Sequence, residues 1–156
     1  MPKRRLASRI LLISPSRRLL LFKIHYKTGV LAGRSYWATP GGGLRDDESF
    51  ETAAIRELYE ETGLDVQSVG CCVASREFFW QMPDGERVFA VENFYVVQTI
   101  SECCSTTRWS YREREAICEV KWWSESALII STEEILPPDL SAIFSRALLM
   151  APSKYG

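Results

Sequence analysis

Short apolar segments bounded by turn-forming residues alternate with longer amphipathic segments along this chain. Runs rich in β-branched and aromatic residues are typical of strands, whereas apolar positions three and four residues apart predict helices. The predicted strands cover residues 4–13, 19–25, 36–38, 66–75, 87–97 and 117–123. The predicted helices cover residues 48–62, 124–130 and 139–150. Strands on both sides of a helix, followed by a late helix, favour an α/β sandwich with a mixed sheet.

Breaks in this pattern predict the connections. Ser14-Pro15-Ser16 should join the first two strands as a hairpin, and Pro83-Asp84-Gly85 should form a second turn. Pro137-Pro138 precedes the last predicted helix, where proline is tolerated. The polar stretch over residues 98–114 is long for a connection, so it is either a binding lid or disordered.

Length and composition favour one globular domain over residues 1–156. With 46% hydrophobic and 25% charged residues, the chain can bury a core large enough to fold alone. No apolar run approaches the roughly 18 residues that a membrane span requires. The five cysteines lack Cys-x-x-Cys spacing, which argues against a zinc site or a disulfide framework. We therefore expect reduced thiols and a cytoplasmic protein without membrane partners.

The net charge of −1 conceals an uneven distribution of charge. Residues 1–45 contain ten lysines or arginines and no acidic residue. A basic region next to an acidic, metal-binding segment would attract a polyanionic substrate, although a solvated basic surface explains most of these residues equally well. Arg34 and Arg45 are the better candidates for substrate binding, because they lie close to a glycine-rich turn.

The segment over residues 42–64 carries the most specific chemistry. At about 100° per residue, Glu57, Glu60 and Glu61 fall on one face of the predicted helix. Three crowded carboxylates repel one another unless a hard divalent cation such as Mg²⁺ or Mn²⁺ binds among them. The alternative is a solvent-facing helix with an ion pair between Arg56 and Glu60.

Helix-capping signals around the segment agree with this assignment. Asp47 or Ser49 can cap the helix start, and Gly63 can adopt the left-handed conformation at its end. The preceding run of residues 40–43, Pro-Gly-Gly-Gly, can offer a carbonyl to a metal or amide groups to a phosphate.

The spacing of Gly42, Glu48 and residues 56–64 (Arg-Glu-Leu-Tyr-Glu-Glu-Thr-Gly-Leu) resembles the complete box of the Nudix hydrolase family. The resemblance implies the Nudix fold, a curled mixed β-sheet sandwiched between α-helices. It also implies hydrolysis of a nucleoside diphosphate linked to another group, with Mg²⁺ or Mn²⁺ as cofactor. The metal ligands that it implies are Glu57, Glu60, Glu61 and the carbonyl of Gly42. Arg56 would orient one of the glutamates, and Glu48 would support the turn.

Many members of the family recruit a further carboxylate from a loop late in the chain. The candidates are Glu113 and Glu115, which precede the last predicted strand. We favour Glu115, because several relatives place such an acid a few residues before that strand's tryptophan. An alternating charged loop without a catalytic role is the competing interpretation.

A nucleobase needs a surface on which to stack, and aromatic side chains provide one. Aromatic residues also fill cores, which is the more common explanation for most of them. The predicted substrate-binding residues are Arg34, Arg45, Tyr36, Trp37, Gly43 and Phe79, with Phe78 and Trp80 as further platforms. Trp80 stands where ADP-ribose pyrophosphatases carry a proline, which argues against that substrate.

Three functions remain after these observations. The leading hypothesis is a metal-dependent pyrophosphohydrolase acting on a small nucleoside diphosphate derivative. A non-catalytic nucleotide-sensing or interaction module is the alternative, although such relatives usually lose one of the box glutamates. A capped RNA substrate is a weaker possibility, since no RNA-binding module is visible and nucleic acid is not expected as a partner. The resemblance also allows a homodimer.

Overall fold

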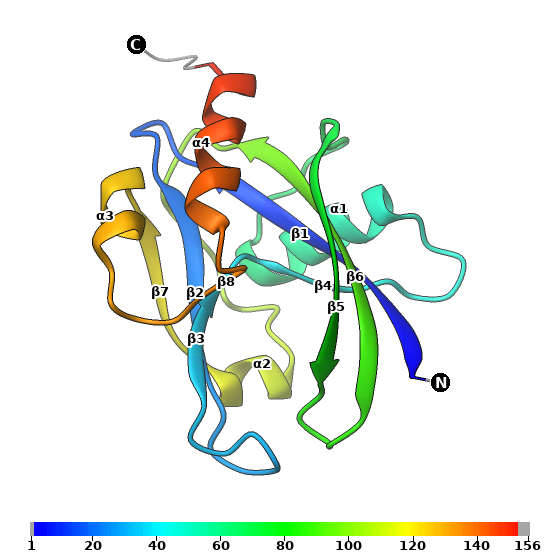
Figure 1. Cartoon of the computed structure of the whole chain (residues 1–156). Helices are drawn as coiled ribbons and strands as arrows, with labels where there is room; N and C mark the ends of the chain where they lie inside the picture. Colours follow the sequence, from blue (N-terminus) through cyan, green and yellow to red (C-terminus); the bar gives the residue numbers. More distant parts are fainter. Residues whose placement is uncertain (1, 153–156) are drawn as a thin grey trace.

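The computed structural model describes residues 2–152, so Met1 and residues 153–156 of the expected domain lie outside the described residues. Within that range, eight strands form one curled mixed sheet with helices on both sides (Figure 1). The strands are β1 (Lys3–Ile13), β2 (Leu19–His25), β3 (Ser35–Ala38), β4 (Gly41–Gly43), β5 (Cys72–Gln81), β6 (Arg87–Gln98), β7 (Ile117–Trp123) and β8 (Ile135–Leu136). The helices are α1 (Phe50–Thr62), α2 (Tyr111–Ala116), α3 (Glu125–Ile130) and α4 (Leu140–Met150). This arrangement confirms the expected fold class.

The first two strands diverge instead of forming a full hairpin. They pair at their turn, where Ile13 lies opposite Leu19. Beyond that point β1 runs parallel to β6 and pairs with β4, while β2 pairs with β3 and β7. The main path through the sheet is therefore β5-β6-β1-β2-β3-β8, with β4 beside β1 and β7 beside β2. The cavity at the site described below is lined by residues of both halves, including Arg9 of β1 and Phe22 of β2.

Each face of the sheet has its own hydrophobic core. Side chains alternate between the faces of β1, so that Ile10 and Leu12 pack towards α1, where they join Leu58. Leu11 and Ile13 pack on the opposite face, in the cluster that includes residues of α4. Because β1 is covered on both sides, its last four residues form the unbroken apolar run seen in the sequence.

The strand and helix predictions succeed where a repeat of apolar positions is long enough. The strand over residues 117–123 and the late helices agree with β7, α3 and α4 to within one residue. The strand expected over residues 66–75 instead begins at Cys72, because Val66 packs against the α1-side core as irregular backbone. The strands β4 and β8 were not predicted, since each is too short to show a periodic pattern. The helix α2 was not predicted because it buries no side chain and so has no apolar face. None of the helices within residues 2–152 is long and apolar enough to cross a membrane.

Candidate metal and phosphate site

Helix α1 has well-defined ends, and these fix the direction of its carboxylates. Ser49 is the N-terminal cap, and its hydroxyl accepts a hydrogen bond from the backbone N–H of Thr52 at 3.1 Å. The other candidate, Asp47, instead adopts a positive φ of 64° in the preceding turn. Gly63 ends the helix in the left-handed conformation that the sequence predicts, with φ of 78°.

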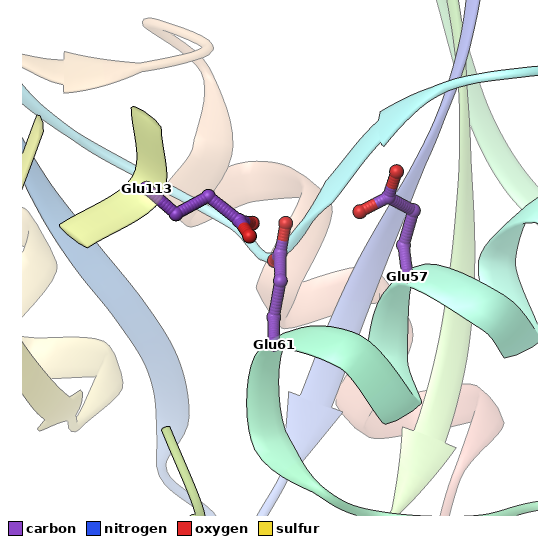
Figure 2. Close-up of side chains that lie close together, drawn as sticks. All are labelled: Glu57, Glu61 and Glu113. Atoms are coloured by element: carbon purple, nitrogen blue, oxygen red, sulfur yellow. The ribbon is translucent and has the colours of Figure 1, made fainter. Parts of the chain in front are cut away.

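Three carboxylates converge at the C-terminal half of α1. Glu57 and Glu61 extend from α1 and Glu113 from α2, and each offers an oxygen within 4.8 Å of the others (Figure 2). Glu61 is only 5% exposed, and the backbone N–H of Gly41 donates to its Oε2 at 3.0 Å. Burial, together with the charges of Glu57 and Glu113, raises the pKa of Glu61 well above its ordinary value. We call these three residues the acidic cluster.

The acidic cluster fits a hard divalent cation. Its donor atoms are all carboxylate oxygens, which Mg²⁺ and Mn²⁺ prefer over nitrogen or sulfur ligands. A cation would also remove the repulsion that raises the pKa of Glu61, because it favours the ionised carboxylates. The arrangement can therefore hold a metal ion beside residues 40–43, which include β4 and which we call the glycine turn.

The glycine turn approaches the acidic cluster so closely that side chains are excluded. A Cβ atom at Gly42 would lie 2.6 Å from Oε1 of Glu57, and one at Gly41 would lie 2.1 Å from the carbonyl oxygen of Ser8. Gly41 also has φ of 145°, a conformation that other residues rarely adopt. Backbone groups of the turn thus lie directly against the carboxylates, as a carbonyl ligand from Gly42 would require.

Glu113, and not the favoured Glu115, completes the acidic cluster. Glu115 is exposed on α2, whereas Glu113 faces Glu61 across the gap between the two helices. The preceding loop is fixed to the end of α1, since the indole N–H of Trp109 donates to the carbonyl of Glu61 at 2.8 Å. A usable sequence signal was the capping box Ser110-Tyr111-Arg112-Glu113, which starts α2 and places Glu113 in its first turn.

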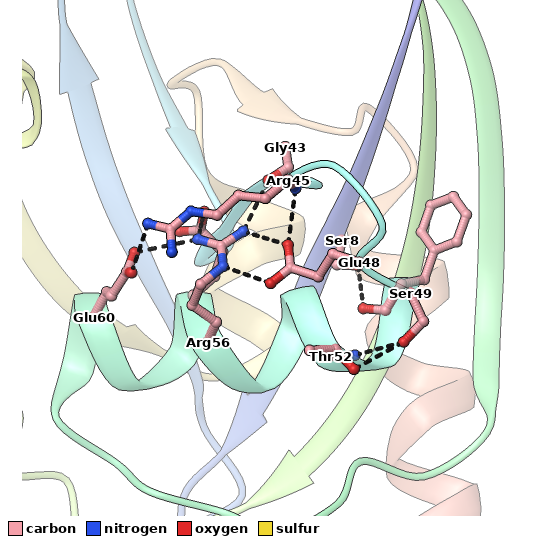
Figure 3. Close-up of polar contacts among 10 residues, drawn as sticks. Ser8, Gly43, Arg45, Glu48, Ser49, Thr52, Arg56 and Glu60 are labelled. Carbon is pink, nitrogen blue, oxygen red and sulfur yellow. Dashed lines mark hydrogen bonds and ion pairs between the residues drawn. The ribbon is translucent and has the colours of Figure 1, made fainter.

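A second group of charges connects the segment just before α1 to the middle of that helix (Figure 3). Arg56 donates two hydrogen bonds to Glu48, at 2.7 and 2.8 Å, and a third to the carbonyl of Gly43 at 3.0 Å. It also donates to Oε1 of Glu57 at 3.0 Å. The hydrogen bonds from Arg56 lower the pKa of Glu48 to about 2. Arg56 thus connects the glycine turn to the helix and holds one carboxylate of the acidic cluster.

Glu60, the remaining carboxylate of the predicted ligand set, points away from the acidic cluster in this structure. It pairs with Nη2 of Arg45 at 3.2 Å and with Nη1 of Arg56 at 3.3 Å. Glu60 is one third exposed and Arg45 two thirds exposed, so water screens the pair between them. Such a weak interaction can yield to a cation or a phosphate.

Of the aromatic residues predicted to bind substrate, Tyr36 and Phe79 line a cavity near the site, whereas Trp37 lies in the core. Tyr36 and Phe79 line a cavity of about 210 Å³, next to a second cavity of about 290 Å³ that reaches the acidic cluster. Arg34 stacks on the ring of Trp80 at 4.7 Å. Trp37 is 2% exposed within the α4-side core, so the structure does not bring it to the site. The reason is strand alternation, which turns neighbouring residues of β3 to opposite faces.

Sequence reasoning missed a buried ion pair at the end of the aromatic cavity. Nε of Arg9 lies 2.9 Å from Oε2 of Glu92, whose side chain is 8% exposed. Arg76 lies 3.7 Å from the other oxygen of Glu92. Arg9 lies on β1, Arg76 on β5 and Glu92 on β6. The parallel pairing of β1 with β6 brings Arg9 close to Glu92.

Fold and site together define a class of protein: a curled mixed sheet between helices that places an acidic cluster around the buried Glu61 against a glycine turn. Comparison with known sequences agrees, because residues 3–144 match the NUDIX domain. The chain therefore belongs to the NUDIX family.

The curated relatives match over part of their length. An RNA pyrophosphohydrolase from Psychromonas ingrahamii is 31% identical over 80 residues, which cover 45% of this chain and 44% of the relative. Subunit 2 of the mRNA decapping complex from Schizosaccharomyces pombe is 35% identical over 88 residues, 56% of this chain but 10% of the relative. The chain thus spans less than half the length of these two relatives.

Solved structures agree on the fold across nearly the whole chain. A MutT protein from Methanosarcina mazei has a TM-score of 0.69 at 18% identity, covering 93% of both chains. The NUDIX domain of NrtR from Shewanella oneidensis, solved with ADP ribose, has a TM-score of 0.65 at 17% identity and covers 97% of this chain and 91% of that one. At these identities the likeness establishes the architecture.

Proposed function

We propose that this protein is a divalent-metal-dependent pyrophosphohydrolase that cleaves a nucleoside diphosphate linked to another group. The observation that carries the proposal is the acidic cluster of Glu57, Glu61 and Glu113, whose Glu61 is buried and whose Glu57 lies against a turn that only glycine allows to come so close. Family membership and the names of the curated relatives support the same reaction class.

In this proposal the acidic cluster holds Mg²⁺ or Mn²⁺, together with the carbonyl of Gly42. A bound ion would neutralise charge on the diphosphate and lower the pKa of an attacking water. Glu60 is a further proposed ligand, available once its screened pair with Arg45 opens. Arg56 fixes the Glu57 carboxylate and the Gly43 carbonyl, so it sets the geometry of the turn.

Glu113 is the proposed proton acceptor for the attacking water. It stands on a different element from the other two carboxylates, and its Oε1 also accepts the backbone N–H of Ser110 at 2.8 Å. A carboxylate held in this way has a defined orientation towards the space inside the acidic cluster. Glu115, expected in this role from the sequence, lacks that placement because its side chain is exposed.

The substrate's base would occupy the cavity of about 210 Å³ that Tyr36 and Phe79 line. A planar base can stack on aromatic rings there, and Arg34 and Arg45 would lie near the charged part of the substrate. The names of the curated relatives also place RNA 5′ ends among the substrates to be tested. The five free cysteines support the proposed cytoplasmic location, and a homodimer stays a proposal by analogy.

The decisive experiment is turnover of a substrate panel by the purified protein with Mg²⁺ or Mn²⁺. The panel should contain dNTPs, nucleotide sugars, ADP-ribose, dinucleoside polyphosphates, and 5′-triphosphorylated and capped RNA. We expect cleavage of a phosphoanhydride in at least one compound, lost in Glu61→Gln. Tight nucleotide binding without turnover across the panel would instead support the sensing module.

A further inference from the structure

Arg5 lies where three cavities of the protein meet. It lines the aromatic cavity of about 210 Å³, the cavity of about 290 Å³ that contains Glu61 and Glu113, and a third of about 560 Å³ bordered by Gly43 and Arg45. Among residues 2–152 no other side chain borders all three of these cavities. A ligand that extends from the aromatic cavity to the acidic cluster would pass this guanidinium.

The guanidinium of Arg5 has no protein partner in the described part of the chain. No carboxylate lies within 4.0 Å of it, and it makes no hydrogen bond. Arg9 points to the same side of β1 four residues later, yet its charge is compensated by Glu92 at 2.9 Å and by the carbonyl of Thr39 at 3.3 Å. Of this pair of arginines, only Arg5 is therefore free to bind a ligand.

Arg5 also lies next to the proposed metal site. Its Nη2 is 3.4 Å from the position that a Cβ atom at Gly43 would occupy, while Oε1 of Glu57 is 2.6 Å from the corresponding position at Gly42. The positive side chain of Arg5 thus lies next to Gly43, and the negative side chain of Glu57 lies next to Gly42. A diphosphate that bridges them would meet a cation on one side and a guanidinium on the other.

An unpaired guanidinium in this position is unfavourable without an anion. Partial burial and the neighbouring charge of Arg9 lower the pKa of Arg5, which means that its surroundings disfavour the charged form. Glu57 and Glu92 offset this effect only in part. A charge kept at an electrostatic cost, beside a cavity and without a carboxylate within 4.0 Å, is a typical feature of a binding site.

We propose that Arg5 is a substrate-binding residue that binds non-bridging phosphate oxygens of the substrate at the edge of the cavity that contains Glu61 and Glu113. The planar fork of a guanidinium suits two such oxygens at once. This inference rests on the proposed function, because it assigns a position to the diphosphate of that reaction. It adds a contact that does not depend on the metal ion.

The kinetic test compares Arg5→Met and Arg5→Lys with the wild-type protein on the best substrate of the panel. We expect Arg5→Met to raise KM at least tenfold while kcat changes by less than about threefold, because a contact made equally in ground and transition states affects binding alone. Arg5→Lys should keep part of the affinity, since it retains a point charge without the fork. The control is Arg146→Met, which removes one exposed charge on α4, far from the cavities.

The binding test separates this inference from the proposed function. Methylenediphosphonate, an uncleavable diphosphate analogue, is titrated in EDTA and in Mg²⁺. We expect at least tenfold weaker binding to Arg5→Met under both conditions, with an unchanged or higher Tm. Equal binding by Arg5→Met and wild type, no binding by wild type, or a lower Tm that accounts for the loss would overturn the inference. Arg5-dependent binding without turnover of any panel member would support it and reject the proposed reaction.

Discussion

The carboxylates before and along α1 have opposite surroundings. Just before the helix, Glu48 is matched by Arg56, and hydrogen bonds hold the pKa of Glu48 at about 2. In the C-terminal half of α1, Glu57 and Glu61 face Glu113, and burial with like charge raises the pKa of Glu61. Glutamates 13 residues apart, Glu48 and Glu61, thus have matched cationic partners in one case and uncompensated like charge in the other.

This difference indicates which carboxylates contribute to stability and which contribute to function. A partly buried carboxylate that is paired by a bidentate arginine holds the glycine turn on the helix. A cluster of like charges around the buried Glu61 costs free energy unless a ligand binds, so folding alone does not explain it. Loss of the pair between Glu48 and Arg56 should therefore lower stability, whereas substitutions in the acidic cluster should abolish activity without lowering stability.

The largest effect should come from Glu61→Gln. Loss of an outer partner of a metal ligand costs about 10–100-fold in activity, so loss of a ligand should cost at least about 100-fold. The metal-free variant should be as stable as wild type or more so, because the substitution removes charge repulsion. Turnover and thermal unfolding in EDTA measure both effects, with Glu51→Gln on the same helix as the control. A Glu61→Gln variant that is destabilised and still active would contradict the functional role assigned to the acidic cluster.

Removal of Arg56 should lower stability as well as activity, because Arg56 also holds the Glu57 carboxylate. The pair with Glu48 is partly buried, with side chains 16% and 9% exposed. Breaking it leaves an uncompensated charge, so Arg56→Met should lower the free energy of unfolding by about 2 kcal/mol. Denaturant unfolding of Arg56→Met, Glu48→Gln and the double variant gives the coupling energy. A coupling below about 0.5 kcal/mol would mean that the pair is only a surface interaction.

The next prediction compares two carboxylates of α2, Glu113 and Glu115. Glu113→Gln should reduce turnover at least tenfold, whereas Glu115→Gln should leave it within about twofold. Both variants change one carboxylate to an amide two residues apart, so general effects on α2 are shared. Steady-state kinetics decide between them, and a loss confined to Glu115→Gln would restore the assignment made from the sequence.

Stability in EDTA should depend on pH with opposite sign for the two groups. The pKa of Glu48 is lowered from 4.5 to about 2, so its stabilising contribution is present above pH 4.5 and is lost as the pH falls towards 2. The pKa of Glu61 is raised, so stability is lost as the pH rises above 4.5 and through its folded-state value. The Tm advantage of Glu61→Gln over wild type should therefore widen with rising pH. A difference that is flat from pH 4 to pH 8 would contradict this.

The box could be predicted from the sequence because its information is local. Helical periodicity places Glu57 and Glu61 on one face, and Ser49 and Gly63 mark the ends of the helix. Glu113 could not be placed with the same certainty, because its approach to Glu61 depends on how the preceding loop is fixed by Trp109. The capping box that begins at Ser110 was the one local signal for it.

Other features depend on strand pairing that no periodic pattern contains. The separation of β1 from β2 and the parallel pairing of β1 with β6 bring Arg9 to Glu92 across the sheet. The same pairing leaves Arg5 between the cavities. The burial of Trp37 follows from which face of β3 each residue occupies, and a four-residue strand gives little indication of that.

The most direct test of the central claim is a crystal soaked in Mn²⁺, with anomalous scattering used to locate the ion. We predict a peak among the carboxylate oxygens of Glu57, Glu61 and Glu113, and none beside the matched pair of Glu48 and Arg56. The peak should disappear in Glu61→Gln. An acidic cluster without manganese in the wild-type crystal, at a concentration that supports turnover, would contradict the account.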